Sequence, residues 1–135
     1  MKQLEDLFEQ YTHKQAVGDV ELPSSGSNRR YFRLTAGDTT AIGAKGTSVE
    51  ENIAFIKLAK HFKKAGLNVP EIYCVSKDNT YYLQEDLGDV TLFNSISKGR
   101  DRGHYDEIET SLIKNTISLL PKFQFEGGRG LDWSI

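Results

Sequence analysis

Residues 30–45 read RYFRLTAGDTTAIGAK, and they form the centre of the expected fold. The first half places aromatic and aliphatic residues between arginines, a pattern that predicts a β-strand. Ala36-Gly37-Asp38 is typical of a tight turn between strands, and Thr39 to Lys45 is the expected second strand. This stretch therefore predicts an antiparallel β-hairpin.

A helix and a second hairpin are expected directly after the first one. Ser48-Val49-Glu50-Glu51 has the S-x-x-E form of a capping box, which predicts a helix that begins here and ends at Gly66. Two runs of β-forming residues, Glu71 to Ser76 and Thr80 to Gln84, flank the turn residues Lys77-Asp78-Asn79. The sequence thus predicts a second hairpin after the helix.

Further helices are expected toward both ends of the chain. Apolar residues spaced by three and four predict an amphipathic helix from Lys2 to about His13 and a long helix from Ile108 to Phe123. A short helix is expected at Thr91 to Ser97, and the polar, Gly-bearing stretch Ser97 to Gly103 is expected to be a loop. The predicted fold class is α+β, an antiparallel β-sheet of about five strands with an inserted helix and flanking helices.

The composition limits the class of protein. The chain has 135 residues, with 17 Lys and Arg against 19 Asp and Glu, so its formal net charge is −2. This balance argues against a basic nucleic-acid binder and a polybasic membrane anchor. No apolar run approaches the roughly 20 residues of a membrane span, and the acidic N-terminus is unlike a signal peptide. With its lone Cys74, the chain is expected to be a globular cytoplasmic protein without a nucleic-acid or membrane partner.

Three stretches carry residues that could bind a ligand. The first is the small-residue loop before the first hairpin, made of Ser24, Ser25, Gly26, Ser27 and Asn28. Small side chains let backbone N–H groups approach a phosphate, and serine and asparagine add donors. Arg29 and Arg30 beside the loop would add positive charge. The alternative is a plain β-turn with solvated arginines.

The second stretch combines a strand lysine with helix glutamates. Lys45 lies at the end of a predicted strand, and Glu50 and Glu51 open the following helix. A strand lysine paired with a helix glutamate is how protein kinases hold the α- and β-phosphates of ATP. The alternative is that Lys45 is solvated and that the glutamates only stabilise the helix N-terminus.

The third stretch runs from an apolar strand into an acidic turn and consists of Gln84, Glu85, Asp86 and Leu87. Exposed backbone at such a strand end can pair with the edge of an adenine ring, whereas the alternative is a solvated turn. No cluster of metal ligands stands out, and His104-Tyr105-Asp106 lacks the downstream asparagine of a kinase catalytic loop. The sequence therefore predicts neither a catalytic residue nor a metal ligand in this segment.

Taken in order, these motifs resemble the aminoglycoside phosphotransferase family. GSNRRYFRL (residues 26–34) looks like the family's G-x-S-N-R-x-Y-x-V loop and strand, and SVEENIAFI (48–56) resembles its glutamate-bearing helix. GLNVPEIY (66–73) is similar to its G-(I/V)-x-V-P-x-(I/V) link, and YLQEDLG (82–88) looks like its hinge. The resemblance covers about residues 20–95 strongly and the last helix loosely.

The resemblance implies a protein-kinase-like N-terminal lobe that binds ATP. The loop Ser24 to Asn28 would cover the phosphates, and the backbone of Gln84 to Leu87 would meet adenine. The helix glutamate would be Glu51, with Glu50 as the second choice. The family's strand lysine falls near residues 42 and 43, which are not cations here, so its role is carried to Lys45, the nearest cation.

The resemblance also implies a division of the chain and a chemistry. Residues 1–19 would be an N-terminal helix and lead-in, 20–90 the nucleotide-binding lobe, and 91–135 a linker and helices leading into a C-terminal lobe outside this sequence. That lobe would supply the catalytic residues and the Mg²⁺ ligands, so this segment alone is expected to be inactive. The reaction would move the ATP γ-phosphoryl group to a small-molecule hydroxyl. The RRYFR run (29–33) further resembles the subgroup that phosphorylates amino sugars.

Two other functions remain open from the sequence. A non-catalytic, kinase-like regulatory or interaction module would keep the lobe but lack the strand lysine. A stand-alone protein with an apolar C-terminal segment would pack on a partner or self-associate. Nucleotide affinity and sedimentation, respectively, test these two alternatives.

Overall fold

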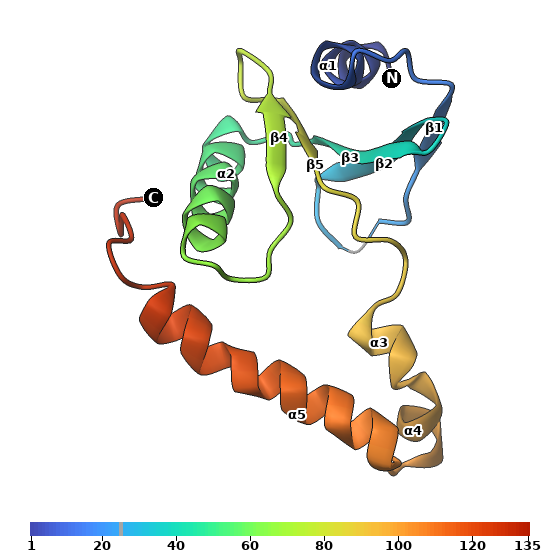
Figure 1. Cartoon of the computed structure of the whole chain (residues 1–135), viewed down its shortest axis with the longest axis vertical. Coiled ribbons are helices and arrows are strands. Elements are labelled where there is room, and N and C mark those ends of the chain that lie inside the picture. Colours follow the sequence, from blue (N-terminus) through green and yellow to red (C-terminus); the bar gives the residue numbers. More distant parts are fainter. Residues whose placement is uncertain (25) are drawn as a thin grey trace. The chain divides into compact units, whose positions relative to one another are not determined.

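The structure, a computed structural model, describes residues 1–24 and 26–135 (Figure 1). The chain divides into two compact units. We call Met1–Asp86 with Trp133–Ile135 the sheet unit, and Leu87–Asp132 the helical unit. Among the described residues, no helix is both long and apolar enough to span a membrane.

The sheet unit is built around one antiparallel sheet. Its elements are α1 (Lys2–Thr12), β1 (Gly18–Glu21), β2 (Arg30–Ala36), β3 (Thr39–Lys45), α2 (Val49–Lys64), β4 (Ile72–Val75) and β5 (Tyr81–Gln84). The strand order is β1-β2-β3-β5-β4, and every neighbouring pair is antiparallel. The predicted α+β class, with a five-stranded antiparallel sheet and an inserted helix, is confirmed.

Local signals in the sequence set the ends of these elements. β2 and β3 form the predicted hairpin, and Gly37 in its turn has a φ of 64°, in the left-handed region that glycine tolerates. The Ser48 hydroxyl accepts a hydrogen bond from the Glu51 N–H at 3.2 Å, so α2 begins where the capping sequence predicts. Gly66, with a φ of 82°, follows the end of that helix.

The two helices of the sheet unit cover opposite faces of the sheet (Figure 1). On the face that we call the α1 face, Leu4 and Phe8 of α1 pack with Leu34 and Leu83. On the opposite face, the α2 face, Ile56 packs with Ala44 and Tyr82, and Tyr31 and Phe55 surround them. Because side chains alternate along a strand, neighbouring residues such as Tyr82 and Leu83 contribute to different faces.

A buried asparagine fastens α2 to the second hairpin. Asn52 is fully buried, and its Nδ2 donates to the carbonyl oxygens of Asn79 at 2.8 Å and Thr80 at 3.2 Å. A Cβ at Gly46 would overlap the Asn52 side chain, so only glycine leaves room for this contact. The position of α2 against the sheet therefore depends on one polar side chain as well as on apolar packing.

The helical unit contains α3 (Leu92–Ser95), α4 (Ser97–Arg102), α5 (Glu107–Pro121) and one π-helical turn, η1 (Lys122–Glu126). The prediction of a loop at Ser97 to Gly103 is wrong, because these residues form α4 and its cap, Gly103, has a φ of 82°. The buried Gly99 has no side chain, so Tyr105 and Glu109 approach its backbone closely. The sequence of α4 shows no periodic apolar residues, so a helix could not be predicted here from its pattern.

Candidate functional site

The predicted phosphate loop lies at the sheet-unit surface just before β2. Ser24, Gly26, Ser27 and Asn28 are exposed, whereas Ser25 lies outside the described residues. Gly26 has a φ of 83°, and nothing lies within 4 Å of where its Cβ would be. Glycine is therefore suited to this position by backbone conformation and leaves the loop open to a ligand.

The loop folds back onto Arg29, whose side chain turns to the α2 face. The Arg29 N–H donates to the Ser27 hydroxyl at 3.1 Å. The Arg29 guanidinium carbon lies 4.9 Å from the ring centre of Phe55 and 5.9 Å from that of Tyr82. Both distances suit cation–π contacts, so one aromatic ring from α2 and one from β5 hold the guanidinium.

The charge of Arg29 is supported by its neighbours. Partial burial acts against the charged form, but Tyr31, Tyr82 and Glu51 outweigh this effect and raise the pKa of Arg29 above its ordinary value. Glu51 belongs to the first turn of α2 and is exposed. Arg29 and the predicted helix glutamate thus lie on one face next to the loop, and a weak long-range charge interaction, not an ion pair, links them.

Lys45 faces the other side of the sheet. It pairs in register with Arg30 and Tyr81, and its Nζ lies 5.9 Å from the Tyr81 ring centre. Tyr81 packs against the core beneath α1, so Lys45 is on the α1 face. Since α2 carries Glu51 on the opposite face, the structure does not bring these two residues together. The nucleotide-binding role given to Lys45 stays a prediction.

Arg30, the other arginine after the loop, already has a partner. Its Nε and Nη2 donate to the two carboxylate oxygens of Glu21 at 2.7 and 2.8 Å, across the β1–β2 pair. The guanidinium carbon also lies 5.1 Å from the ring centre of Phe32, a residue of the α1 face. The side chains of the two successive arginines, Arg29 and Arg30, therefore lie on opposite faces of the sheet.

The predicted hinge is tied to the sheet by Asp86. The Arg33 guanidinium donates to both Asp86 carboxylate oxygens, from Nε at 2.7 Å and from Nη2 at 3.0 Å. The side chain of Asp86 is only 8% exposed. This bidentate pair joins β2 to the end of β5, so the carboxylate of Asp86 positions the hinge.

The other hinge residues differ in what they offer to a ligand. The Glu85 N–H donates to the Glu71 carbonyl at 2.8 Å, and the Glu85 carboxylate accepts from the Glu71 N–H at 3.1 Å. Gln84 lies in register with Ile42, and its buried Oε1 has no hydrogen-bond partner within the described part of the chain. Leu87 is exposed and begins the helical unit. The Glu85 N–H is thus engaged, and the Gln84 side-chain oxygen is buried without a partner among the described residues.

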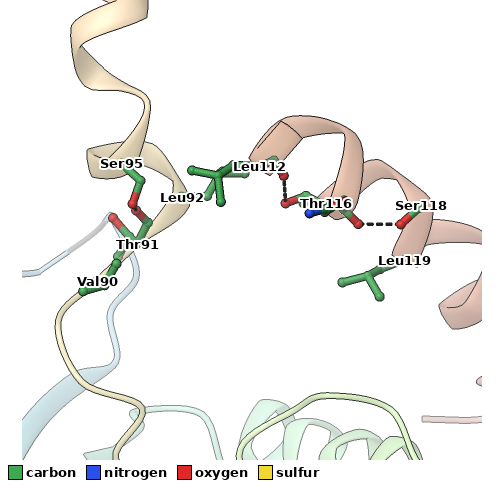
Figure 2. Close-up of a pocket in the computed structure, with 9 residues that line it drawn as sticks. Val90, Thr91, Leu92, Ser95, Leu112, Thr116, Ser118 and Leu119 are labelled. Carbon is green, nitrogen blue, oxygen red and sulfur yellow. Dashed lines mark hydrogen bonds between the residues drawn. The ribbon is translucent and has the colours of Figure 1, made fainter. Parts of the chain in front are cut away.

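The helical unit holds a hollow of its own, with a volume of about 460 Å³, between α3 and α5 (Figure 2). Leu92, Leu112 and Leu119 line it together with Val90. The hydroxyls on its wall bond to their own helices, as in the contact of Thr116 with the Leu112 carbonyl at 2.9 Å. None of its lining residues is charged, so this hollow lacks groups for phosphate chemistry.

Sequence reasoning missed two polar anchors of the site. Neither Asn52 nor the Arg33–Asp86 pair could be assigned from spacing, because their partners lie 27 and 53 residues away. No three His, Cys, Asp or Glu side chains gather into a potential metal site within residues 1–24 and 26–135. The candidate site on the α2 face therefore combines the described loop residues with the clamped Arg29, with Glu51 and with the hinge residues 84–86 at the end of β5.

Comparison with known proteins adds one relationship. No family model matches the chain. An N-acetylmuramate/N-acetylglucosamine kinase of Pseudomonas aeruginosa is 31% identical to it over 81 residues. This similarity suggests a kinase relationship. The match covers 59% of this chain but only 24% of that protein, so the chain spans about a quarter of the relative's length.

Proposed function

We propose that this chain is the ATP-binding portion of a longer phosphotransferase, which transfers the γ-phosphoryl group of ATP to a hydroxyl of a small molecule. The observation that carries the proposal is the grouping of the clamped Arg29 and of Glu51 on the α2 face, next to the exposed loop residues Ser24, Gly26, Ser27 and Asn28. The similarity to a kinase supports it. The five-stranded antiparallel sheet with its inserted helix is compatible with a kinase-like N-terminal lobe.

In this proposal, the chain positions the nucleotide and neutralises its charge. Backbone N–H groups of the loop and the charge of Arg29 face the phosphates, while the hinge at Gln84 to Leu87 meets adenine. The acceptor hydroxyl attacks the γ-phosphorus, the bond to the bridging oxygen breaks, and ADP leaves. The acceptor's proton passes to a base in the remainder of the protein.

Mg²⁺ and the acceptor belong to the remainder of the proposed protein. Mg²⁺ prefers carboxylate and water oxygens, and the described residues bring no such cluster together. When bound, the metal neutralises charge on the β- and γ-phosphates. We propose an amino sugar or aminoglycoside-like acceptor, since the similar protein is named a kinase of two amino sugars and the RRYFR run resembles that subgroup.

Titration calorimetry of this chain with ATP, ADP and adenosine, with and without Mg²⁺, tests nucleotide binding. We expect saturable binding of all three, tightest for ATP.

In the intact protein, Glu51→Ala is expected to lower turnover of an amino-sugar substrate about tenfold or more without unfolding, because Glu51 is exposed. Unchanged turnover removes Glu51 from the site, and absence of ATP binding contradicts the proposal.

A non-catalytic regulatory module is the second candidate. The observation that favours it is the position of Lys45 on the α1 face, which leaves Ile42 and Ala44 as the β3 residues near the α2 face. A regulatory lobe would show no Mg²⁺-dependent ATP binding even in the intact protein. The same titration on the intact protein therefore separates the two functions.

A further inference from the structure

We infer that Arg29 binds the phosphate groups of the nucleotide in place of a strand lysine, an inference that rests on the proposed function. Arg29 directly follows the Ser24–Asn28 loop and turns to the α2 face, where Glu51 also lies. A loop cation that stands beside the helix glutamate can balance the same phosphates as a lysine on β3. Its planar guanidinium also offers two parallel donors to phosphate oxygens.

The aromatic clamp holds Arg29 in place before a ligand binds. Phe55 of α2 and Tyr82 of β5 stack around the guanidinium at 4.9 and 5.9 Å. Tyr82 is fully buried and Phe55 packs on it with a ring separation of 5.5 Å, so the clamp is part of the core. A side chain that is already ordered loses little conformational entropy when it binds an anion.

The hydrogen bonds of Arg29 are incomplete. Its Nε is buried and has no partner within the described residues. An unpaired buried donor costs free energy, and a purely structural arginine would be expected to satisfy it. Arg30, one residue later, uses both arms of its guanidinium on Glu21. Arg29 has a side-chain hydrogen bond to Tyr31, and its Nε is the donor that stays without a partner in the described part of the chain.

Other cations around the site have partners or lie on the other face. Arg33 is paired with Asp86 at the hinge, Lys63 with Glu85 and Arg30 with Glu21, whereas Lys45 lies on the α1 face. Among the described residues, Arg29 is the cation next to the loop whose side chain turns to the α2 face. The charge of Glu51 acts on Arg29 from a distance and favours its charged form.

Calorimetric titration of the full chain with Mg-ATP, ADP and adenosine tests the inference. We expect Arg29→Gln to weaken ATP and ADP binding about tenfold or more and to leave adenosine affinity unchanged. Arg29→Lys keeps the charge and is expected to recover part of the loss. Arg129→Gln, at an exposed arginine of the helical unit, is the matched control, since it removes the same charge away from the site, and it should bind ATP like the wild type.

Each outcome decides between the inference and the proposed function. If the wild-type chain binds no ATP, the proposed function fails and the role of Arg29 fails with it. If the wild type binds ATP and Arg29→Gln binds it equally well, the Arg29 assignment alone is wrong. If Lys45→Gln weakens ATP binding instead, Lys45 is the residue that binds the phosphates. Equal weakening of ATP and adenosine, in a variant that melts like the wild type, shows that Arg29 only shapes the pocket.

Discussion

At the scale of single residues, Asn52 joins the helix to the sheet through two hydrogen bonds. We expect Asn52→Ala to lower the free energy of unfolding by about 1–3 kcal/mol, because the carbonyl groups of Asn79 and Thr80 lose a buried donor. Urea denaturation followed by circular dichroism measures this change. Asn115→Ala, at an exposed asparagine of α5, is the control and should change stability little.

The residues of the site show what a sequence can predict about chemistry. The Ser/Gly loop and the capping sequence are local signals, and the capping sequence marks the start of α2 as predicted, whereas the binding role of the loop stays a prediction. Strand alternation puts Lys45 on the face of Gly43, which the structure bears out. No local pattern in the sequence reports which of the two faces carries α2, however. The structure puts Lys45 on the α1 face and Arg29 on the α2 face, and our inference that Arg29 is the site cation rests on this difference.

At the scale of elements, α1 and β3 meet at Gly43. A Cβ at this position would lie 2.9 Å from methyl carbons of both Leu4 and Leu34, so α1 approaches the strand only because glycine is there. We expect Gly43→Ala to cost about 1–3 kcal/mol by overpacking. Leu4→Ala is expected to cost about 2–5 kcal/mol, since it leaves a cavity in the core under α1.

The double variant of Gly43 and Leu4 tests the contact directly. With a smaller residue at position 4, the added methyl at position 43 has room, so the combined cost should be less than the sum of the two single costs. Chemical denaturation of all four proteins gives this coupling energy. If the two costs simply add, the methyl at position 43 does not collide with Leu4. The explanation that Gly43 is needed for the close packing of α1 on β3 would then be wrong.

Element prediction succeeded where periodicity or caps were strong. The two hairpins and α2 carry turn residues or a capping box, and their bounds agree with the structure within a few residues. β1 was not predicted as a strand, because its four residues, GDVE, show no apolar alternation. Pairing with β2 across the register from Gly18 to Glu21 makes it a strand. Likewise, α4 depends on contacts at Gly99 rather than on a local pattern.

At the scale of the whole molecule, the two units differ in how they are stabilised. The buried apolar residues all belong to the sheet unit, whereas in residues 87–132, all of which the structure describes, none of the apolar side chains is buried. The helical unit relies instead on polar contacts such as the capping box of Asp106 with Glu109 and the ion pair of Arg102 with Glu109. Helices without a buried apolar face gain little stability from packing.

This difference predicts uneven hydrogen exchange along the full chain. Backbone amides of β3 and β5, in the centre of the sheet, should exchange through global opening, and those of α5 should exchange much faster through local opening. Exchange measured by mass spectrometry on peptides from each element tests this. Mg-ATP should slow exchange in the loop before β2 and leave α5 unchanged, since the proposed contacts lie in the sheet unit. If α5 without ligand were as protected as β3, its apolar side chains, Ile117 and Leu120 among them, would be covered in solution. If that protection also depended on protein concentration, self-association would be the cause.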